Sequence, residues 1–170
     1  MEVNHSFETR LRKFLANCKK IAIIGVGNPL LGDDSIGNKV IDLLAERNVN
    51  VDLFKAFQAP ENVLSKFLES DHSHIIVIDA AEMGLNPGDF KIIEIEMLPN
   101  ETITTHTVPL KLMLKSLISV GKKVLVIGIQ IEKVGFYEVS EKVVSGINKL
   151  IEILYEVLKD MCSYDSSKIL

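Results

Sequence analysis

The sequence predicts an α/β fold: a three-layer α/β/α domain on a mostly parallel, twisted, five-stranded sheet with one antiparallel edge strand. Strand-like and helix-like segments alternate along the chain, which is the pattern of a parallel sheet with helices on both faces. Two of these segments, IAIIGV at 21–26 and HIIVIDA at 74–80, are almost continuously apolar. Such runs are typical of strands that are buried on both sides.

The elements follow one another in a regular order. Apolar residues at helical spacing predict a short amphipathic helix in residues 5–18, ahead of the first strand. The other predicted helices occupy residues 33–48, 60–70, 110–120 and 140–161. The other predicted strands occupy residues 51–56, 74–80, 89–96 and 122–130. Segment 89–96 follows an Asn-Pro-Gly turn and alternates apolar with polar residues, which favours a half-exposed edge strand.

Length and composition indicate one globular domain over residues 1–170. The chain is 47% hydrophobic and 25% charged, which is ordinary for a globular protein, and 170 residues are enough for one sizeable core. Residues 1–19 form a predicted helical extension before the first strand. Residues 162–170, which carry no apolar periodicity, are predicted to be a frayed tail.

Charge and cysteine usage exclude several classes of protein. A net charge of −4 argues against capture of nucleic acid or of an anionic membrane. The apolar runs are too short to span a bilayer, and the N-terminal residues lack the order of a signal peptide. The two cysteines, Cys18 and Cys162, cannot supply a disulfide framework. We therefore expect a cytoplasmic protein. We also expect a monomer, because the sequence has no heptad seam.

The fold predicts where a site would lie. Parallel sheets bind ligands at the carboxyl ends of their strands, where the strand order reverses. If the first and third strands are neighbours, that crevice lies between the loops that begin at Gly27 and at Asp79. The glycine-rich segment GVGNPLLGDDSIG at 25–37 lacks the dinucleotide pattern, because Leu30 occupies the position of the third glycine. A Walker loop is also absent.

Three side chains could meet at this crevice. Asp33 and Asp34 lie at the expected start of a helix, where one could cap the helix while the other points into the crevice. Asp79 ends an apolar strand, where a charge is costly unless it has a partner or a role; a turn or cap role is the alternative. His106, in the polar loop TTHTVP, is the one histidine that can reach the same place, although a lone loop histidine is more often a surface residue.

Two carboxylates and one imidazole suit a divalent transition metal with open coordination positions. We therefore interpret Asp34, Asp79 and His106 as a metal-binding set, with Asp33 as the rival of Asp34. A nucleophilic triad and an ordinary zinc protease are not supported, because both GxSxG and HExxH are missing.

Four motifs in this order carry a resemblance to a known family: GVGNPLLGDDSIG, DAAEMGLNPGDFKIIE, TTHTVPL and VLVIGIQIEKVGFYEVS. The chain resembles the hydrogenase maturation endopeptidases from about Ile21 to the closing helix. Within this family it is most similar to the hydrogenase 3, or formate hydrogenlyase, type, to which QAPEN at 58–62 also points. The resemblance implies a twisted sheet flanked by helices.

The resemblance also implies an activity and a set of site residues. Such an enzyme removes the C-terminal extension from the precursor of a nickel–iron hydrogenase large subunit after nickel has been inserted. The positions that contact nickel in the family correspond to Asp34, Asp79 and His106, of which the two aspartates are the catalytic candidates. The nickel is expected to arrive with the precursor, and no other cofactor is implied. The first twenty residues and the segment AFQAPEN depart from many members.

Two alternatives from other classes remain at this point. A receiver-like phospho-acceptor domain also has an aspartate at the end of its third strand, but it needs a lysine right after the last core strand, where this chain has GIQIE and Lys133 lies too far along. A non-catalytic nickel-dependent assembly chaperone would use the same crevice. It would bind the precursor without shortening it.

Overall fold

The computed structural model describes residues 2–98, 110–133, 135, 136 and 138–163. The sheet has the order β2-β1-β3-β5-β4. Its strands are β1 (Ile21–Val26), β2 (Asp52–Phe57), β3 (His74–Ala81), β4 (Phe90–Ile93) and β5 (Lys123–Gln130). Neighbouring strands are parallel except for β4, which pairs antiparallel with β5 at the edge. The predicted fold class, the adjacency of the first and third strands and the antiparallel edge strand are confirmed.

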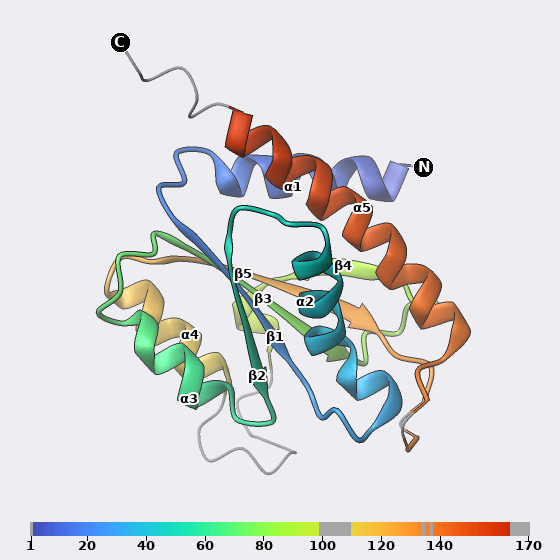
Figure 1. Ribbon diagram of the computed structural model, residues 1–170. Helices are drawn as coiled ribbons and strands as arrows, with labels where there is room; N and C mark the ends of the chain where they lie inside the picture. Colours follow the sequence, from blue (N-terminus) through green and yellow to red (C-terminus); the bar gives the residue numbers. More distant parts are fainter. Residues whose placement is uncertain (1, 99–109, 134, 137, 164–170) are drawn as a thin grey trace.

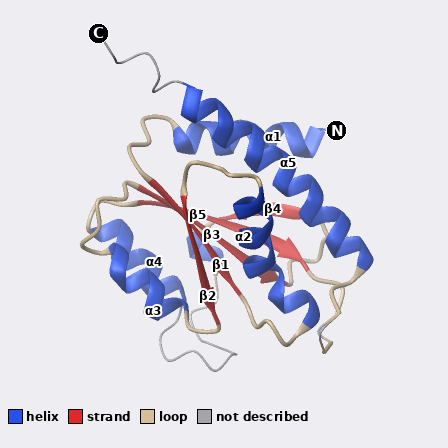
Figure 2. Cartoon of the chain, in the orientation of Figure 1, coloured by secondary structure: helices blue, strands red, loops and turns tan. Residues whose placement is uncertain are grey.

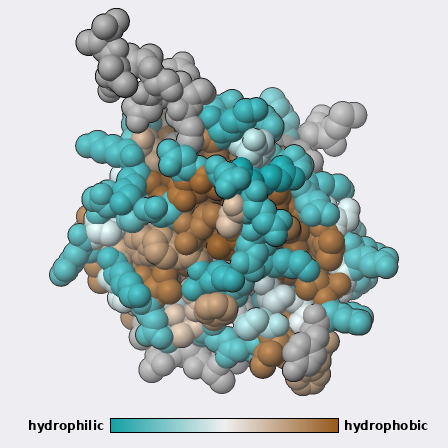
Figure 3. All heavy atoms as spheres, in the orientation of Figure 1, coloured by the Kyte–Doolittle hydropathy of each residue, from teal (hydrophilic) through white to brown (hydrophobic). Residues whose placement is uncertain are grey.

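Helices cover both faces of the sheet (Figures 1 and 2). They are α1 (Glu2–Leu15), α2 (Ile36–Glu46), α3 (Pro60–Leu64), α4 (Leu110–Ser119) and α5 (Glu141–Ser163). Three short 3-10 turns are η1 (Gly32–Ser35), η2 (Ser65–Phe67) and η3 (Ile95–Met97). None of the helices in the described ranges is long and apolar enough to cross a membrane. In the orientation of Figure 1, hydrophilic residues surround the outline of the molecule and apolar surface lies near its centre (Figure 3).

Strand alternation divides the core between the two faces. Ile23 of β1 and Ile76 of β3 pack with α1, α2 and α5, while Ile24 and Val77 pack with α3 and α4. All four side chains are fully buried. Because successive strand residues point to opposite faces, a strand between two helical layers must be apolar at every position. This explains why IAIIGV has no polar residue.

Several predicted boundaries were wrong. The edge strand expected at 89–96 covers only Phe90–Ile93, and Ile95–Met97 form η3. The helix expected at 33–48 begins as a 3-10 turn and becomes α-helical only at Ile36. The helix expected at 60–70 ends at Leu64 and tightens into η2, as helix ends often do. The closing helix continues to Ser163, so the first two residues of the expected tail, 162 and 163, are helical. Residues 164–170 lie outside the described ranges.

The predicted N-terminal helix is present as α1. Its apolar stripe enters the core beside α5: Leu11 is fully buried, and Phe7 packs edge-to-face on Phe90 of β4. Arg12, on the exposed side, pairs with Asp160 of α5 at 2.8 Å. The extension is therefore an integral part of one helical layer.

We expect Leu11→Ala to lower the free energy of unfolding by about 2–3 kcal/mol, because it opens a cavity between α1 and the sheet. The neighbouring Arg12→Ala variant, which loses only exposed ion pairs, should cost less than about 1 kcal/mol. Urea denaturation of both variants measures the difference. Equal, small effects would mean that α1 does not contribute to the core.

Candidate active site

Two glycines bring the start of α2 onto the ends of β1 and β3. A Cβ atom at Gly37 would overlap the carbonyl oxygens of Val26 and Ile78, and one at Gly25 would overlap the carbonyl of Gly37. Only a residue without a side chain allows such close backbone approach. Asp34 lies one helical turn before Gly37, and Asp79 directly follows Ile78. The two aspartates therefore approach each other at the carboxyl edge of the sheet.

Asp34 lies in the 3-10 turn η1 and is partly exposed. Its Oδ2 accepts a hydrogen bond from the backbone N–H of Asn28, at 3.0 Å. The loop can fold back this closely because Gly27 has a φ of +138° and a Cβ there would overlap the carbonyl oxygen of Asp34. The predicted capping role is wrong, because the N-cap of α2 is Ser35 and no side chain caps it.

Asp79 lies near the end of β3, where it pairs with Gly128 of β5. Burial raises the pKa of its carboxyl group to about 7, and the negative charge of Asp34 contributes to the rise. A hydrogen bond from the Ala80 backbone acts in the opposite direction but is weaker. The pair is therefore electrostatically coupled, and near neutral pH Asp79 can both hold and release a proton.

Asp33 has a different environment from Asp34. Its side chain is fully buried, and its Oδ2 accepts hydrogen bonds from the N–H groups of Glu132 and Lys133, at 2.8 and 3.0 Å. Its Oδ1 accepts the N–H of Ser140 at 2.7 Å, and the Ser140 hydroxyl donates to Oδ2 at 3.0 Å. Burial alone would raise its pKa, but these bonds outweigh burial and lower it. Asp33 thus holds the β5–α5 loop, and both of its carboxylate oxygens accept hydrogen bonds from that loop.

Gln130 holds another loop beside the pair, and sequence reasoning missed it. This residue ends β5 and is almost fully buried. Its Oε1 accepts the N–H groups of Met83 and Leu85 at 2.7 and 3.2 Å, and its Nε2 donates to Glu82 at 2.8 Å. Gln130 therefore fixes the loop that follows Asp79. The sequence contains a pattern that could have identified Gln130, because this polar residue follows an apolar strand segment just as Asp79 does.

The third predicted metal ligand, His106, lies outside the described residues. His72 and His74 lie where β3 begins, at the opposite edge of the sheet from the aspartates. His72 bonds Asp52 at 2.7 Å there. Among the described residues, no group of three or more histidine, cysteine or acidic side chains is placed to hold a metal. The described part of the chain therefore supplies two carboxylates of the predicted set.

Comparisons with known proteins identify the family. The sequence model of the family described as hydrogenase maturation protease, HycI, matches residues 38–157. The hydrogenase 3 maturation protease of Escherichia coli K12 is 32% identical over 143 residues, which are 81% of this chain and 87% of that protein. These matches agree with the four sequence motifs and with the predicted hydrogenase 3 type.

Solved structures give the same result. The NiFe hydrogenase maturation protease HycI of Thermococcus kodakarensis has a TM-score of 0.77 and 27% identity, over 88% of this chain and 99% of that one. The endopeptidase HycI of Escherichia coli has a TM-score of 0.69 and 28% identity, over 78% and 87% of the two chains. The chain is a peptidase, and it belongs to the hydrogenase maturation protease family.

Proposed function

We propose that this protein is the endopeptidase that removes the C-terminal extension from the nickel-loaded precursor of a nickel–iron hydrogenase large subunit. The observation that supports this function is the pair of Asp34 and Asp79 at the carboxyl edge of the sheet, in a chain of this family. The names of its relatives describe proteases that act in hydrogenase maturation. We place the reaction in the cytoplasm and assign it to a monomer.

Nickel is part of the substrate in this proposal. The precursor presents the ion, already bound by its own cysteine thiolates, and Asp34, Asp79 and His106 meet it. Without the cation, burial and the charge of Asp34 disfavour the ionised form of Asp79. A cation between the two carboxylates reverses this balance, because each becomes a favourable ligand. The protease thereby distinguishes a loaded precursor from an empty one.

The same contact positions the scissile bond. A precursor held by its nickel presents the adjacent peptide carbonyl to the two aspartates, which makes the attack effectively intramolecular. Asp34 or Asp79 accepts a proton from a water molecule while the oxygen of that water attacks the carbonyl carbon. The carbon–nitrogen bond then breaks, and the released amine takes up a proton. The products are a shortened large subunit and a free C-terminal peptide.

The experiment that tests this function is mass spectrometry of the purified precursor before and after mixing with the protein. We expect the mass of the nickel-loaded precursor to fall by that of its C-terminal extension, and the nickel-free precursor to keep its mass. If the loaded precursor binds the protein but keeps its full length, the protein is an assembly chaperone and not the protease. Equal cleavage of both forms would mean that recognition of the precursor does not depend on nickel.

A further inference from the structure

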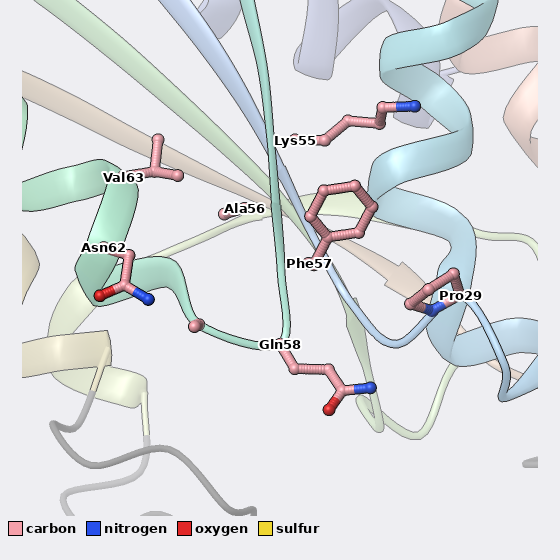
Figure 4. Close-up of a pocket in the computed structure, with 8 residues that line it drawn as sticks. Pro29, Lys55, Ala56, Phe57, Gln58, Asn62 and Val63 are labelled. Atoms are coloured by element: carbon pink, nitrogen blue, oxygen red, sulfur yellow. The ribbon is translucent and has the colours of Figure 1, made fainter.

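A cleft of about 440 Å³ opens at the end of β2, next to the loop that leads to Asp34. Its lining includes Pro29, Ala56, Phe57, Gln58, Asn62 and Val63. Figure 4 shows Phe57 and Pro29 on one side of the β2 ribbon, and Asn62 and Val63 of α3 on the other. The cleft therefore lies across the end of a strand that is the outermost in the sheet.

Phe57 has an unusual backbone in this cleft. Its φ is +52°, a conformation that is unfavourable for a bulky side chain. Two hydrogen bonds hold it: Gly27 N–H donates to the Phe57 carbonyl at 2.8 Å, and Phe57 N–H donates to Asn38 Oδ1 at 3.3 Å. Asn38 is itself buried and donates to the Gly27 carbonyl at 2.8 Å. These hydrogen bonds thus fix the backbone of Phe57 in this conformation.

The strain at Phe57 is not offset by full burial of the ring. Phe57 remains 47% exposed. Asparagine or glycine would adopt the same backbone at lower cost. An exposed apolar ring at a strained position is typical of a binding surface. The ring is buried only when a ligand binds, and the free energy of that burial offsets the strain.

The cleft is linked to Asp34 through the loop that begins at Gly27. Pro29 lines the cleft, and its neighbour Asn28 donates its N–H to Asp34. The same loop is joined to Phe57 through Gly27. The cleft and Asp34 therefore share one loop, so a chain that occupies the cleft lies beside that aspartate.

The chemistry of the lining fits an extended polypeptide. The outermost strand of a sheet is the element to which an extended peptide pairs, with pockets for alternate side chains. Phe57 and Pro29 offer apolar contacts on one side of the strand end and Val63 on the other, while the amides of Gln58 and Asn62 can donate to and accept from a peptide backbone. Lys55 also lines the cleft: its ammonium lies over the Phe57 ring, 5.8 Å from the ring centre, and pairs with Asp42 at 2.8 Å.

We propose that this cleft is the subsite for the precursor segment beside the scissile bond, bound in extended form with an apolar side chain against Phe57. This inference rests on the proposed function, because that function supplies the polypeptide. Phe57 acts here as a binding residue that sets the path of the substrate chain toward the two aspartates.

The test uses Phe57→Asn, with Val120→Asn as the matched control. Val120 is 51% exposed and precedes β5, at the opposite edge of the sheet. We expect Phe57→Asn to raise KM for the nickel-loaded precursor at least about 10-fold with kcat nearly unchanged, since uniform binding is lost. Its melting temperature should stay within about 2 °C of wild type or rise, because asparagine tolerates this backbone. Val120→Asn should leave KM unchanged.

Two results would overturn the subsite. If KM is unchanged in Phe57→Asn while wild type cleaves normally, the cleft does not bind the substrate, and the proposed function is unaffected. A lower melting temperature with reduced kcat assigns Phe57 a structural role. A photoreactive phenylalanine analogue at position 57, compared with one at 120, gives a readout that does not need cleavage. Cross-links to the precursor tail from 57 alone support the subsite even if no tail is released, and their absence rejects it.

Discussion

Asp79→Asn is expected to reduce removal of the precursor tail at least about 100-fold and, at the same time, to make the protein more stable at neutral and alkaline pH. Activity falls because the amide can neither accept a proton nor match a carboxylate as a ligand for nickel. Stability rises because burial and the charge of Asp34 disfavour the ionised form of Asp79 in the folded protein. Under the proposed function, the burial that prepares Asp79 for the reaction therefore also weakens the fold.

The direction of the pH dependence follows from the two pKa values. The carboxyl of Asp79 has a pKa of 3.8 as an isolated group and about 7 in the folded protein. Between these values the folded protein keeps a proton that the unfolded chain releases, so the contribution of Asp79 to stability is complete below pH 3.8 and is lost as the pH rises through 7. Asparagine does not titrate. The advantage of the variant should grow between pH 5 and pH 8, to roughly 5 °C in melting temperature.

Thermal unfolding of both proteins across this pH range measures the effect. Asp42→Asn is the control, because Asp42 is an exposed aspartate on α2 whose carboxylate pairs with Lys55. Its melting temperature should follow that of wild type at every pH. A constant difference between Asp79→Asn and wild type would show that Asp79 does not titrate abnormally, and retained cleavage would remove it from the mechanism.

Most of the fold was predictable because it depends on local patterns. Uninterrupted apolar runs identified β1 and β3, and the rule that ligand loops lie at the carboxyl ends of parallel strands placed Gly27 and Asp79 at one edge. The antiparallel β4 followed from its alternation after the Asn-Pro-Gly turn. These features need no knowledge of distant contacts.

The choice between Asp33 and Asp34 was not predictable in the same way. Both acids precede α2 and differ by one position, so helix-start chemistry treats them alike. Their roles separate because Asp33 bonds Glu132 and Ser140, which lie about a hundred residues further along the chain. Contacts at that sequence separation leave no local pattern. The structure thus assigns Asp33 to loop anchoring and leaves Asp34 beside Asp79.

Phe57 was also hidden from sequence reasoning. Phe57 directly follows the predicted strand 51–56 as one more apolar residue, so nothing in the sequence indicates a positive φ. The turn of the backbone is imposed by its two hydrogen bonds, to Gly27 and Asn38, which come from a different loop and a different helix. Local propensity would place glycine or asparagine here. A mismatch of this kind is expected where function overrides local preference.

Asp33→Ala is expected to lower the free energy of unfolding by about 3–5 kcal/mol, because it leaves the buried N–H groups that Asp33 binds without an acceptor. The β5–α5 loop packs tightly here: a Cβ at Gly32 would overlap the carbonyl oxygens of Gly135 and Glu138. Releasing the loop therefore affects more than one bond. Ser140→Ala, which loses only the hydroxyl donor to Asp33, should cost about 1 kcal/mol.

The pH dependence of this second effect runs opposite to that of Asp79. The pKa of Asp33 is lowered in the folded protein, so its contribution to stability is present above pH 3.8 and is lost as the pH falls through the folded value. Urea denaturation at pH 7 and below pH 3.8 should therefore show a large gap between wild type and Asp33→Ala that narrows in acid. A gap of less than about 1 kcal/mol at pH 7 would mean that other contacts hold the loop. Asp33 would then be free to compete with Asp34 for the substrate's nickel, and the assignment of the two acids would have to be reversed.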